Sequence, residues 1–391
     1  MLARADELAA ISEEDGRLTR GFATPALARA SDRVATWMED AGLTVRRDAV
    51  GNVIGRVGAG RPLVLGSHID TVPDAGRYDG PLGVLLALAV AERVAASGDG
   101  GSLEVVAFAD EEGSRFGTSY LGSSAYTGSF ERVWLDVVDG AGVTLRDAIR
   151  TAGGDPDAAV TAPVPELAGY VEVHIEQGPV LEREGLPVGV VTAIAGQTRA
   201  RIVLTGEAGH AGTLPMEARR DALAAAAEVV LAVERLGRAE PGLVATVGAL
   251  SLLPNVGNVV AGEARMLLDV RHADDRIRRR AAEEIRDEAE RIAASRGVDA
   301  AWALRYDTPA VELDPRLRGR LVDAVRDQGL PVRELVSGAG HDAVVLSRIC
   351  PAAMLFVRCA GGISHDPRES VSEGDVAVAL DVLERVVRSV A

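Results

Sequence analysis

The chain has 391 residues, of which 47% are hydrophobic and 26% are charged, and its formal net charge is −16. This length exceeds that of one typical core, so we expect two domains of a soluble globular protein. The acidic balance without a basic cluster disfavours nucleic acid as a partner. No run of about 18 apolar residues is present, so neither a membrane span nor a membrane partner is expected. Two cysteines without CxxC spacing, and no apolar leader segment, favour a cytoplasmic location.

The first half of the chain alternates between predicted helices and predicted strands. Leu27, Val34 and Met38 recur at helical spacing, and a hairpin over 43–57 bends at Gly51. Pro81 begins a helix that reaches about Ser97. Buried strands are expected at 62–65, 103–109, 170–175 and 188–194. Strands that alternate with helices predict an α/β domain with a mostly parallel, helix-covered sheet.

From about residue 195 the pattern changes to strand–helix–strand–strand–helix–strand. The expected segments are 200–205, 218–236, 244–250, 264–270, a helix with Ile277 and Ile285 on one face, and 302–306. This order predicts an α+β sandwich over 195–310, inserted into a domain that comprises 1–194 and 311–391. The chain then returns with a helix over 316–327, a buried strand at 353–357 and a helix that starts at Ser372.

Three carboxylates, Asp110, Glu111 and Glu112, follow the apolar strand at 103–109. Three acids in a row repel one another unless cations compensate them. Candidate metal ligands occur at or beyond the ends of other strands: His68, Asp79, His174 and His365. Imidazole and carboxylate groups suit divalent ions such as Zn, Mn, Co or Ni. The carboxyl ends of such strands meet at one sheet edge, so we expect these side chains to lie together there. Ligands of these types and in this number are suited to a pair of divalent metal ions.

Two nearby acids, Asp70 and Glu111, are expected to act at the site without binding a metal ion. Asp70, two residues after His68, is placed to hold the imidazole tautomer. Glu112 is expected to be a ligand, and Glu111 is then free to act as the general base that takes a proton from water. Each residue alone has an ordinary structural reading, such as a packed histidine or a helix N-cap at Asp79. Their joint occurrence favours a two-metal hydrolase.

The inserted segment contributes further candidates. His210 lies among glycines, which indicates close approach to an oxyanion or, equally, a surface loop. Asn258 and Arg271 are apt for a substrate carboxylate, although a turn and a surface salt bridge explain them as well. Outside the inserted segment, His341 is expected to order its loop through Asp342.

The motifs together resemble the N-carbamoyl-L-amino acid amidohydrolases and their allantoate amidohydrolase and β-ureidopropionase relatives, within the aminoacylase-like dinuclear metallohydrolase clan. The resemblance covers nearly the whole chain and is carried by the segments 66–72, 78–84, 110–116, 174–179, 337–343 and 364–367. Glu111-Glu112-Gly113-Ser114-Arg115-Phe116 and His174-Ile175-Glu176-Gln177-Gly178 separate this branch from the aminoacylases and dipeptidases.

The resemblance implies a role for each matching residue. His68, Asp79 and His174 would hold one metal ion, and Asp79, Glu112 and His365 the other, with Asp79 bridging and Glu111 as the base. Substrate contacts would come from Gln177, His210, Asn258, Arg271, Gly338 and Ala339, with Asn258 and Arg271 gripping the carboxylate. The inserted domain would act as a lid and form a homodimer, in which His210 acts at the partner subunit's catalytic site.

The implied reaction is metal-dependent hydrolysis of the ureido C–N bond of an N-carbamoyl-L-amino acid, which gives the L-amino acid, carbon dioxide and ammonia. Allantoate is the alternative small ureido-acid substrate. An aminoacylase or dipeptidase is disfavoured by Gln177, and a non-catalytic ligand-binding relative is disfavoured by Glu111. The chain departs from the family pattern at Gly209, Leu214 and Ala261, which concerns the geometry of the lid loop.

Overall fold

The computed structural model describes residues 1–97 and 101–390, and the chain divides into two compact units. The larger unit comprises Met1–Thr192 and Leu313–Ala391, and the inserted unit comprises Ala193–Glu312. The junctions fall within two residues of the expected limits at 194/195 and 310/311. Among the described residues, no helix combines the length and apolarity that crossing a membrane requires.

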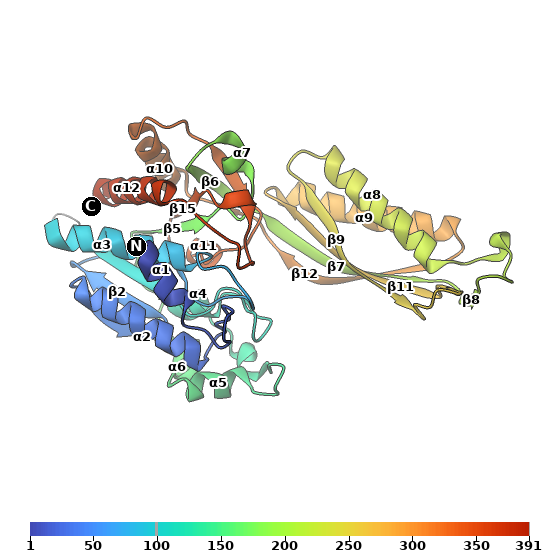
Figure 1. The fold of residues 1–391 in the computed structure, drawn as a ribbon, viewed down its shortest axis with the longest axis horizontal. Coiled ribbons are helices and arrows are strands. Elements are labelled where there is room, and N and C mark those ends of the chain that lie inside the picture. The colour runs from blue at the N-terminus through green and yellow to red at the C-terminus, as the bar shows by residue number, and fades with distance from the viewer. Residues whose placement is uncertain (98–100, 391) are drawn as a thin grey trace. The chain divides into compact units, whose positions relative to one another are not determined.

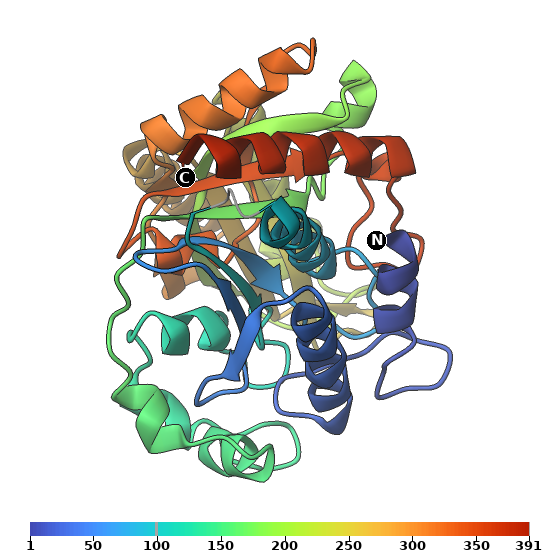
Figure 2. The same cartoon turned by 90° about the vertical axis from the view of Figure 1, so that its left-hand side faces the viewer.

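The larger unit is built on a twisted sheet with the strand order β1-β2-β4-β3-β5-β15-β6, and β14 also pairs with β6 (Figures 1 and 2). These strands are β1 (Thr44–Arg47), β2 (Val53–Val57), β3 (Leu63–His68), β4 (Leu103–Phe108), β5 (Gly169–Ile175), β6 (Val188–Ile194), β14 (Glu334–Ser337) and β15 (Ala352–Val357). The helices are α1 (Leu2–Ala9), α2 (Pro25–Asp40), α3 (Pro81–Ser97), α4 (Leu121–Tyr126), α5 (Leu145–Thr151), α6 (Pro156–Val160), α7 (Val180–Glu184), α10 (Pro315–Asp327), α11 (Ala343–Leu346) and α12 (Glu373–Val390). Short 3₁₀ turns are η1 (Arg132–Asp136) and η3 (Ala360–Gly362).

The centre of this sheet is parallel, because β3 pairs in parallel with both β4 and β5, and β15 pairs in parallel with β5. The mainly parallel α/β prediction is therefore confirmed. The flanks differ from it: β2 runs antiparallel to β4, and β6 runs antiparallel to β15. The expected hairpin is present as β1 and β2, which are antiparallel because a short turn can join only antiparallel strands.

Helix α3 forms because Pro81 supplies a preset first-turn dihedral and a long apolar run follows it. The helix is apolar on almost all sides, and it packs on β3, β4 and β5 as well as on α1 and α12. It therefore belongs to the main core of the larger unit. At the other end of the chain, α12 begins as expected, with Asp375 N donating to Ser372 Oγ at 3.0 Å.

The inserted unit contains an antiparallel sheet with the order β12-β7-β11-β9. Its elements are β7 (Gly196–Thr205), β8 (Gly209–His210), η2 (Met216–Ala218), α8 (Ala222–Ala239), β9 (Val244–Leu253), β10 (Val259–Val260), β11 (Glu263–His272), α9 (Asp275–Ser295), β12 (Asp299–Thr308) and β13 (Val311–Glu312). Alternate side chains of β11 are buried together with residues of α8 and α9, as an α+β sandwich requires. Helix α8 starts four residues later than expected, because the carboxylate of Asp221 accepts the amides of Leu223 and Ala224 as an N-cap.

Candidate metal centre

Two histidines reach the site from neighbouring strands at the point where the strand order reverses. From β3 the chain passes to β4 on one side, and β5 then pairs with the opposite side of β3. Open α/β sheets place their sites at such a reversal, beyond the carboxyl ends of the strands. The β3–β5 pairing ends at Leu65 and Val171, three residues before His68 and His174. Both imidazoles are buried, and their ring centroids lie 5.8 Å apart.

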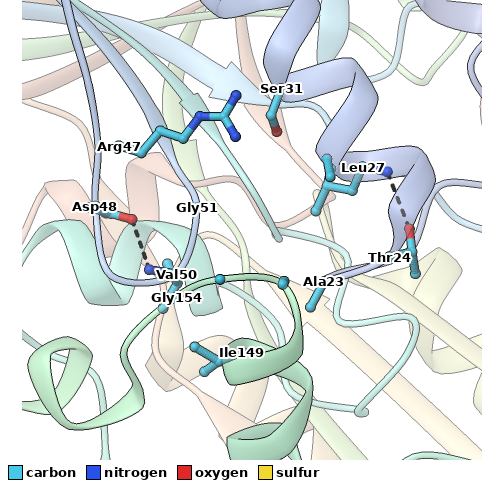
Figure 3. A pocket seen from close by; sticks show the side chains of 13 residues that line it. Ala23, Thr24, Leu27, Ser31, Arg47, Asp48, Val50, Gly51, Ile149 and Gly154 are labelled. Carbon is cyan, nitrogen blue, oxygen red and sulfur yellow. Dashed lines mark hydrogen bonds between the residues drawn. The ribbon is translucent and has the colours of Figure 1, made fainter.

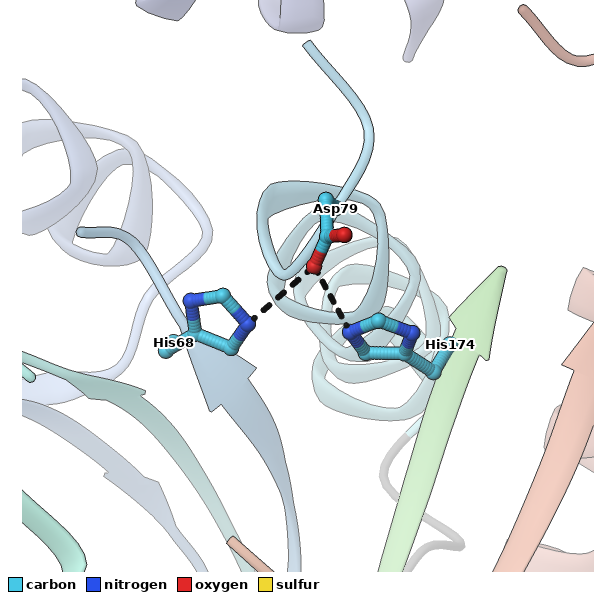
Figure 4. Close-up of side chains that lie close together, drawn as sticks. All are labelled: His68, Asp79 and His174. Carbon is cyan, nitrogen blue, oxygen red and sulfur yellow. Dashed lines mark ion pairs between the residues drawn. The ribbon is translucent and has the colours of Figure 1, made fainter. Parts of the chain in front are cut away.

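Asp79 lies between these histidines, two residues before the start of α3 (Figure 4). Its Oδ1 is 3.5 Å from His68 Nε2 and 3.2 Å from His174 Nε2. The side chain is therefore directed at the imidazoles and does not cap α3. One nitrogen or oxygen atom from each of these three residues lies within 4.8 Å of the others, as a common metal ion would require.

A second set of three potential ligands shares Asp79. His365 Nε2 lies 3.4 Å from Asp79 Oδ2 and 3.3 Å from Glu112 Oε1. His365 has the left-handed backbone angle φ 56° and is 47% exposed, whereas Asp79 and Glu112 are largely buried. Non-glycine residues in this region are uncommon and cluster at functional sites. The structure thus brings all five expected ligands together, in two groups that meet at Asp79.

The acidic run after β4 is held in place by Asp70. Asp70 Oδ1 accepts the amide of Glu111 at 3.0 Å, and Oδ2 accepts the amide of Glu112 at 3.2 Å. Asp70 Oδ1 also lies 3.3 Å from His68 Nδ1, as expected for a carboxylate that fixes the imidazole tautomer. The contacts with the acidic run are an addition that the spacing of the sequence does not reveal. One buried side chain therefore orients a predicted ligand and the predicted base together.

Glu111 is positioned to exchange a proton beside these groups. Ligand atoms of Glu111, Glu112 and His68 all lie within 4.8 Å of one another. Burial raises the pKa of the Glu111 carboxyl well above its ordinary value, the charge of His68 opposes this rise, and that of Glu112 adds to it. A carboxyl group with a raised pKa can both accept and return a proton near neutral pH.

The charges at the site fit a cation. Burial disfavours the ionised form of Asp79, but the charge of His174 and hydrogen bonds with three imidazoles hold the Asp79 pKa well below its ordinary value. Hydrogen bonding to Asp79 and then Glu112 raises the pKa of His365 to about 10. The carboxylates thus attract positive charge, and the donor set of imidazole nitrogen and carboxylate oxygen is one that divalent ions accept.

Two further side chains contact Asp79. Gln177 Nε2 donates to Asp79 Oδ2 at 2.8 Å, and Ser364 Oγ donates to the same oxygen. Gln177 was expected at the site as a substrate contact, whereas Ser364 was not singled out. Its only signal in the sequence is its place directly before His365. Both groups lock the orientation of the shared carboxylate.

The loop between β14 and α11 carries Gly338, Ala339 and His341. The His341 ring is buried with its centroid 4.6 Å from that of His174, and Nε2 lies 2.8 Å from Ser337 Oγ. Burial lowers the pKa of His341 well below its ordinary value, so the ring is neutral. His341 therefore supports His174 by packing, and its hydrogen bond is made with Ser337 and not with Asp342.

The inserted unit places its three predicted substrate residues in two locations. His210 in β8 pairs with Val259 of β10, and Ala211 N donates to Asn258 O at 2.9 Å, so His210 and Asn258 are neighbours. Arg271 lies near the opposite end of β11 from Glu263, which adjoins β10, roughly 27 Å away at a rise of about 3.4 Å per residue. There Arg271 forms a two-point ion pair with Asp269. Asn258 and Arg271 of one chain therefore do not lie side by side.

A separate hollow of about 160 Å³ lies between α2, the β1–β2 turn and the end of α5 (Figure 3). Two of its polar groups are already used: Thr24 accepts the amide of Leu27, and Asp48 accepts that of Val50. None of its lining residues is a predicted site residue.

Fold and site together define a class of protein: an α/β domain with an inserted α+β sandwich and a cluster able to hold two divalent ions at the edge of its sheet. Residues 64–389 match peptidase family M20/M25/M40. An N-carbamoyl-L-amino acid amidohydrolase of Geobacillus stearothermophilus is 39% identical over 98% of this chain and 96% of that protein. An allantoate deiminase of Arabidopsis thaliana is 38% identical over 98% of this chain and 81% of that protein.

Solved structures of known proteins are also similar to this chain. The crystal structure of an amidase of the hydantoinase/carbamoylase family from Burkholderia multivorans has a TM-score of 0.94 and 36% identity, and the match covers 100% of this chain and 97% of that one. A dinuclear metal-binding M20 peptidase of Bacillus subtilis, 16% identical with a TM-score of 0.63, shares the fold. The chain belongs to peptidase family M20/M25/M40, in the branch of the hydantoinase/carbamoylase amidases, and is a hydrolase of amide bonds.

Proposed function

We propose that this protein hydrolyses the ureido C–N bond of N-carbamoyl-L-amino acids with the help of two divalent metal ions. The observation that carries the proposal is a buried carboxyl group, Glu111, placed beside two sets of ligand atoms that share Asp79. The relatives named for carbamoyl amino acids, at 39% and 36% identity, supply the substrate class.

One metal ion is assigned to His68, Asp79 and His174, and the other to Asp79, Glu112 and His365. The convergence of their nitrogen and oxygen atoms within 4.8 Å in each set supports this assignment. Bound divalent ions supply Lewis acidity, which polarises a carbonyl group and lowers the pKa of water. Zn, Mn, Co and Ni all suit the donor set.

Glu111 carries the proton through the reaction. Its carboxylate takes a proton from the attacking water, whose oxygen adds to the carbamoyl carbon. The C–N bond to the amino acid then breaks, and Glu111 returns the proton to the leaving nitrogen. The carbamate that remains decays to carbon dioxide and ammonia. The raised pKa of Glu111 suits a group that must hold this proton between the two steps.

Substrate recognition is assigned to Gln177, Gly338 and Ala339 in the larger unit, and to His210, Asn258 and Arg271 in the inserted unit. Because His210 and Asn258 lie near one end of β11 and Arg271 near the other, one inserted unit cannot present all three to one small molecule. This separation supports a homodimer, in which His210 and Asn258 come from one copy of the chain and Arg271 from the other.

Allantoate is the alternative substrate, and the 38% identity to an allantoate deiminase favours it specifically. It is also a ureido compound with a carboxylate, so the same metal ligands, base and Arg271 would serve it. The two candidate substrates therefore differ in the pocket residues that they require and not in the chemistry of bond cleavage.

Ammonia release distinguishes them. Protein loaded with Mn, Co, Ni or Zn is tested in parallel on a panel of N-carbamoyl-L-amino acids and on allantoate. We expect turnover of several carbamoyl amino acids. Turnover of allantoate alone would assign the protein to the second reading, and silence on both would contradict the ureido proposal.

A further inference from the structure

Glu369 is a buried carboxylate that is neither one of the assigned metal ligands nor the group assigned to proton transfer. It follows His365 by four residues and is 3% exposed. Its Oε1 accepts the amide of Tyr78 at 2.6 Å and the amide of Asp79 at 3.0 Å. These partners are about 290 residues away along the chain. One carboxylate oxygen thus connects the peptide backbone of Asp79 to the loop that carries His365.

The loop itself holds Glu369 firmly. Glu369 N donates to Asp366 O at 3.0 Å, and Ala360 N donates to Ser370 O at 2.9 Å, which closes the base of the loop. On the other side Gly76 leaves room for the carboxyl group, because a Cβ there would lie 2.4 Å from Glu369 Cδ. The path from His365 to Asp79 is therefore short and tightly packed.

The position of Asp79 matters for both sets of ligands. Its Oδ1 faces His68 and His174, and its Oδ2 faces His365. A shift of the Asp79 backbone would change every one of these distances at once. Ser364 and Gln177 fix the carboxylate end of the side chain, but Glu369 is the group bound to its main-chain end. Groups that orient a metal ligand typically affect affinity by about 10–100-fold.

We propose that Glu369 is a positioning residue that sets the spacing of the two metal sites by anchoring Asp79 to the His365 loop. The proposal rests on the metal centre of the proposed function, but it does not depend on which ureido compound is the substrate. It requires only an acceptor at Oε1, so glutamine can replace glutamate whereas alanine cannot.

The test measures the affinity of the metal-free full-length protein for Mn²⁺ and Zn²⁺ by competition with a chelator, with thermal unfolding followed in parallel. Glu369→Ala should bind both ions about 10–100-fold more weakly than the unchanged chain. Glu369→Gln should stay within about threefold, because its amide oxygen can accept the same two backbone N–H groups. Gly76→Ala, which displaces the carboxyl without removing it, should weaken binding in the same direction and keeps the test valid if Glu369→Ala does not fold.

Asp314→Ala is the matched control. Asp314 also accepts two backbone amides, from Arg316 and Leu317, but it does so at the N-terminus of α10, more than 50 residues along the chain from any ligand. It should lower the unfolding temperature and leave metal affinity unchanged. The proposal is overturned if Glu369→Ala loses thermal stability but binds metal normally, or if Glu369→Gln binds as weakly as Glu369→Ala. Failure of the unchanged chain to bind two ions would instead contradict the metal centre itself.

Discussion

At the scale of single residues, Asp79 shows that the role of a side chain depends on the residues around it in the folded chain. By residue type and place it suits an N-cap as well as a ligand, and only the imidazoles on both sides direct it to the site. The sequence predicted all five clustered side chains because three of them are among only six histidines, and Asp79 and Glu112 stand in motifs that resemble the family. It missed Ser364 and Glu369, since serine and glutamate are common in loops and their contacts with Asp79 arise only in the folded chain.

Protonation of the imidazoles should make metal binding depend on pH. His365 has a pKa raised to about 10, and those of His68 and His174 are also raised despite burial, because Asp79 and Asp70 favour their charged forms. A metal ion must therefore displace protons at pH 7. We expect more than one proton released per chain and tighter binding as the pH rises from about 6 to 9. Calorimetry in buffers of different ionisation enthalpy counts these protons.

His365→Ala should release fewer protons, whereas His272→Ala, in the inserted unit, should release the same number as the unchanged chain. The sign for stability is opposite to that for metal binding. A raised imidazole pKa stabilises the metal-free fold below the ordinary pKa of 6.5, and this contribution is lost as the pH rises through about 10. Metal binding without proton release would contradict the assignment of these imidazoles.

At the scale of elements, the sequence predicted most helices and strands but not all of their pairing. Pro81 and a run of apolar residues define α3 locally, so its limits agree with the expectation. The antiparallel pairings of β2 with β4 and of β6 with β15 were not predictable, because the direction of a strand depends on which strand it meets in space. The late start of α8 likewise depends on whether Asp221 or an earlier residue caps it.

Gly83 in α3 packs closely on the sheet, whereas Gly319 in α10 has open space beside it, so we expect their replacement by alanine to have opposite effects. A Cβ on Gly83 would lie 2.2 Å from Val173 O and 2.9 Å from Ser67 Cβ, next to both buried histidines. Gly83→Ala should therefore lower the free energy of unfolding by about 1–3 kcal/mol, the usual cost of overpacking. Gly319 in α10 has no atom within 4 Å of such a Cβ, so Gly319→Ala should raise it by about 0.5–1 kcal/mol through helix propensity. Urea denaturation measures both, and equal effects would contradict the packing described for α3.

At the scale of the whole molecule, the proposed homodimer requires a surface through which two copies of the chain can associate. Strand β9 is an edge of the inserted sheet, has ten residues and contains neither a charge nor a proline. An edge of this kind is a template for pairing with another chain unless it is blocked. The opposite edge, β12, carries Asp299, Arg305 and Asp307. We therefore predict that two copies associate through β9.

Leu250→Lys, at a position 44% exposed in β9, should weaken the dimer at least about tenfold, because a charge blocks an edge strand. Leu304→Lys, at a position 59% exposed in β12, is the matched control and should leave the dimer intact. Light scattering coupled to size exclusion over a range of concentrations gives the masses. A chain that is monomeric throughout, or a control that dissociates first, would exclude this arrangement.

The most direct test of the central claim is ammonia release from N-carbamoyl-L-amino acids while metal-free protein is titrated with Mn²⁺, for the unchanged chain and for Glu111→Gln. We predict that full activity needs the second equivalent of metal. Glu111→Gln should bind two equivalents with similar affinity but lose about 10²–10⁴-fold in turnover, as expected for the loss of a general base. Full activity at one equivalent, or turnover retained in Glu111→Gln, would contradict a two-metal centre served by this base.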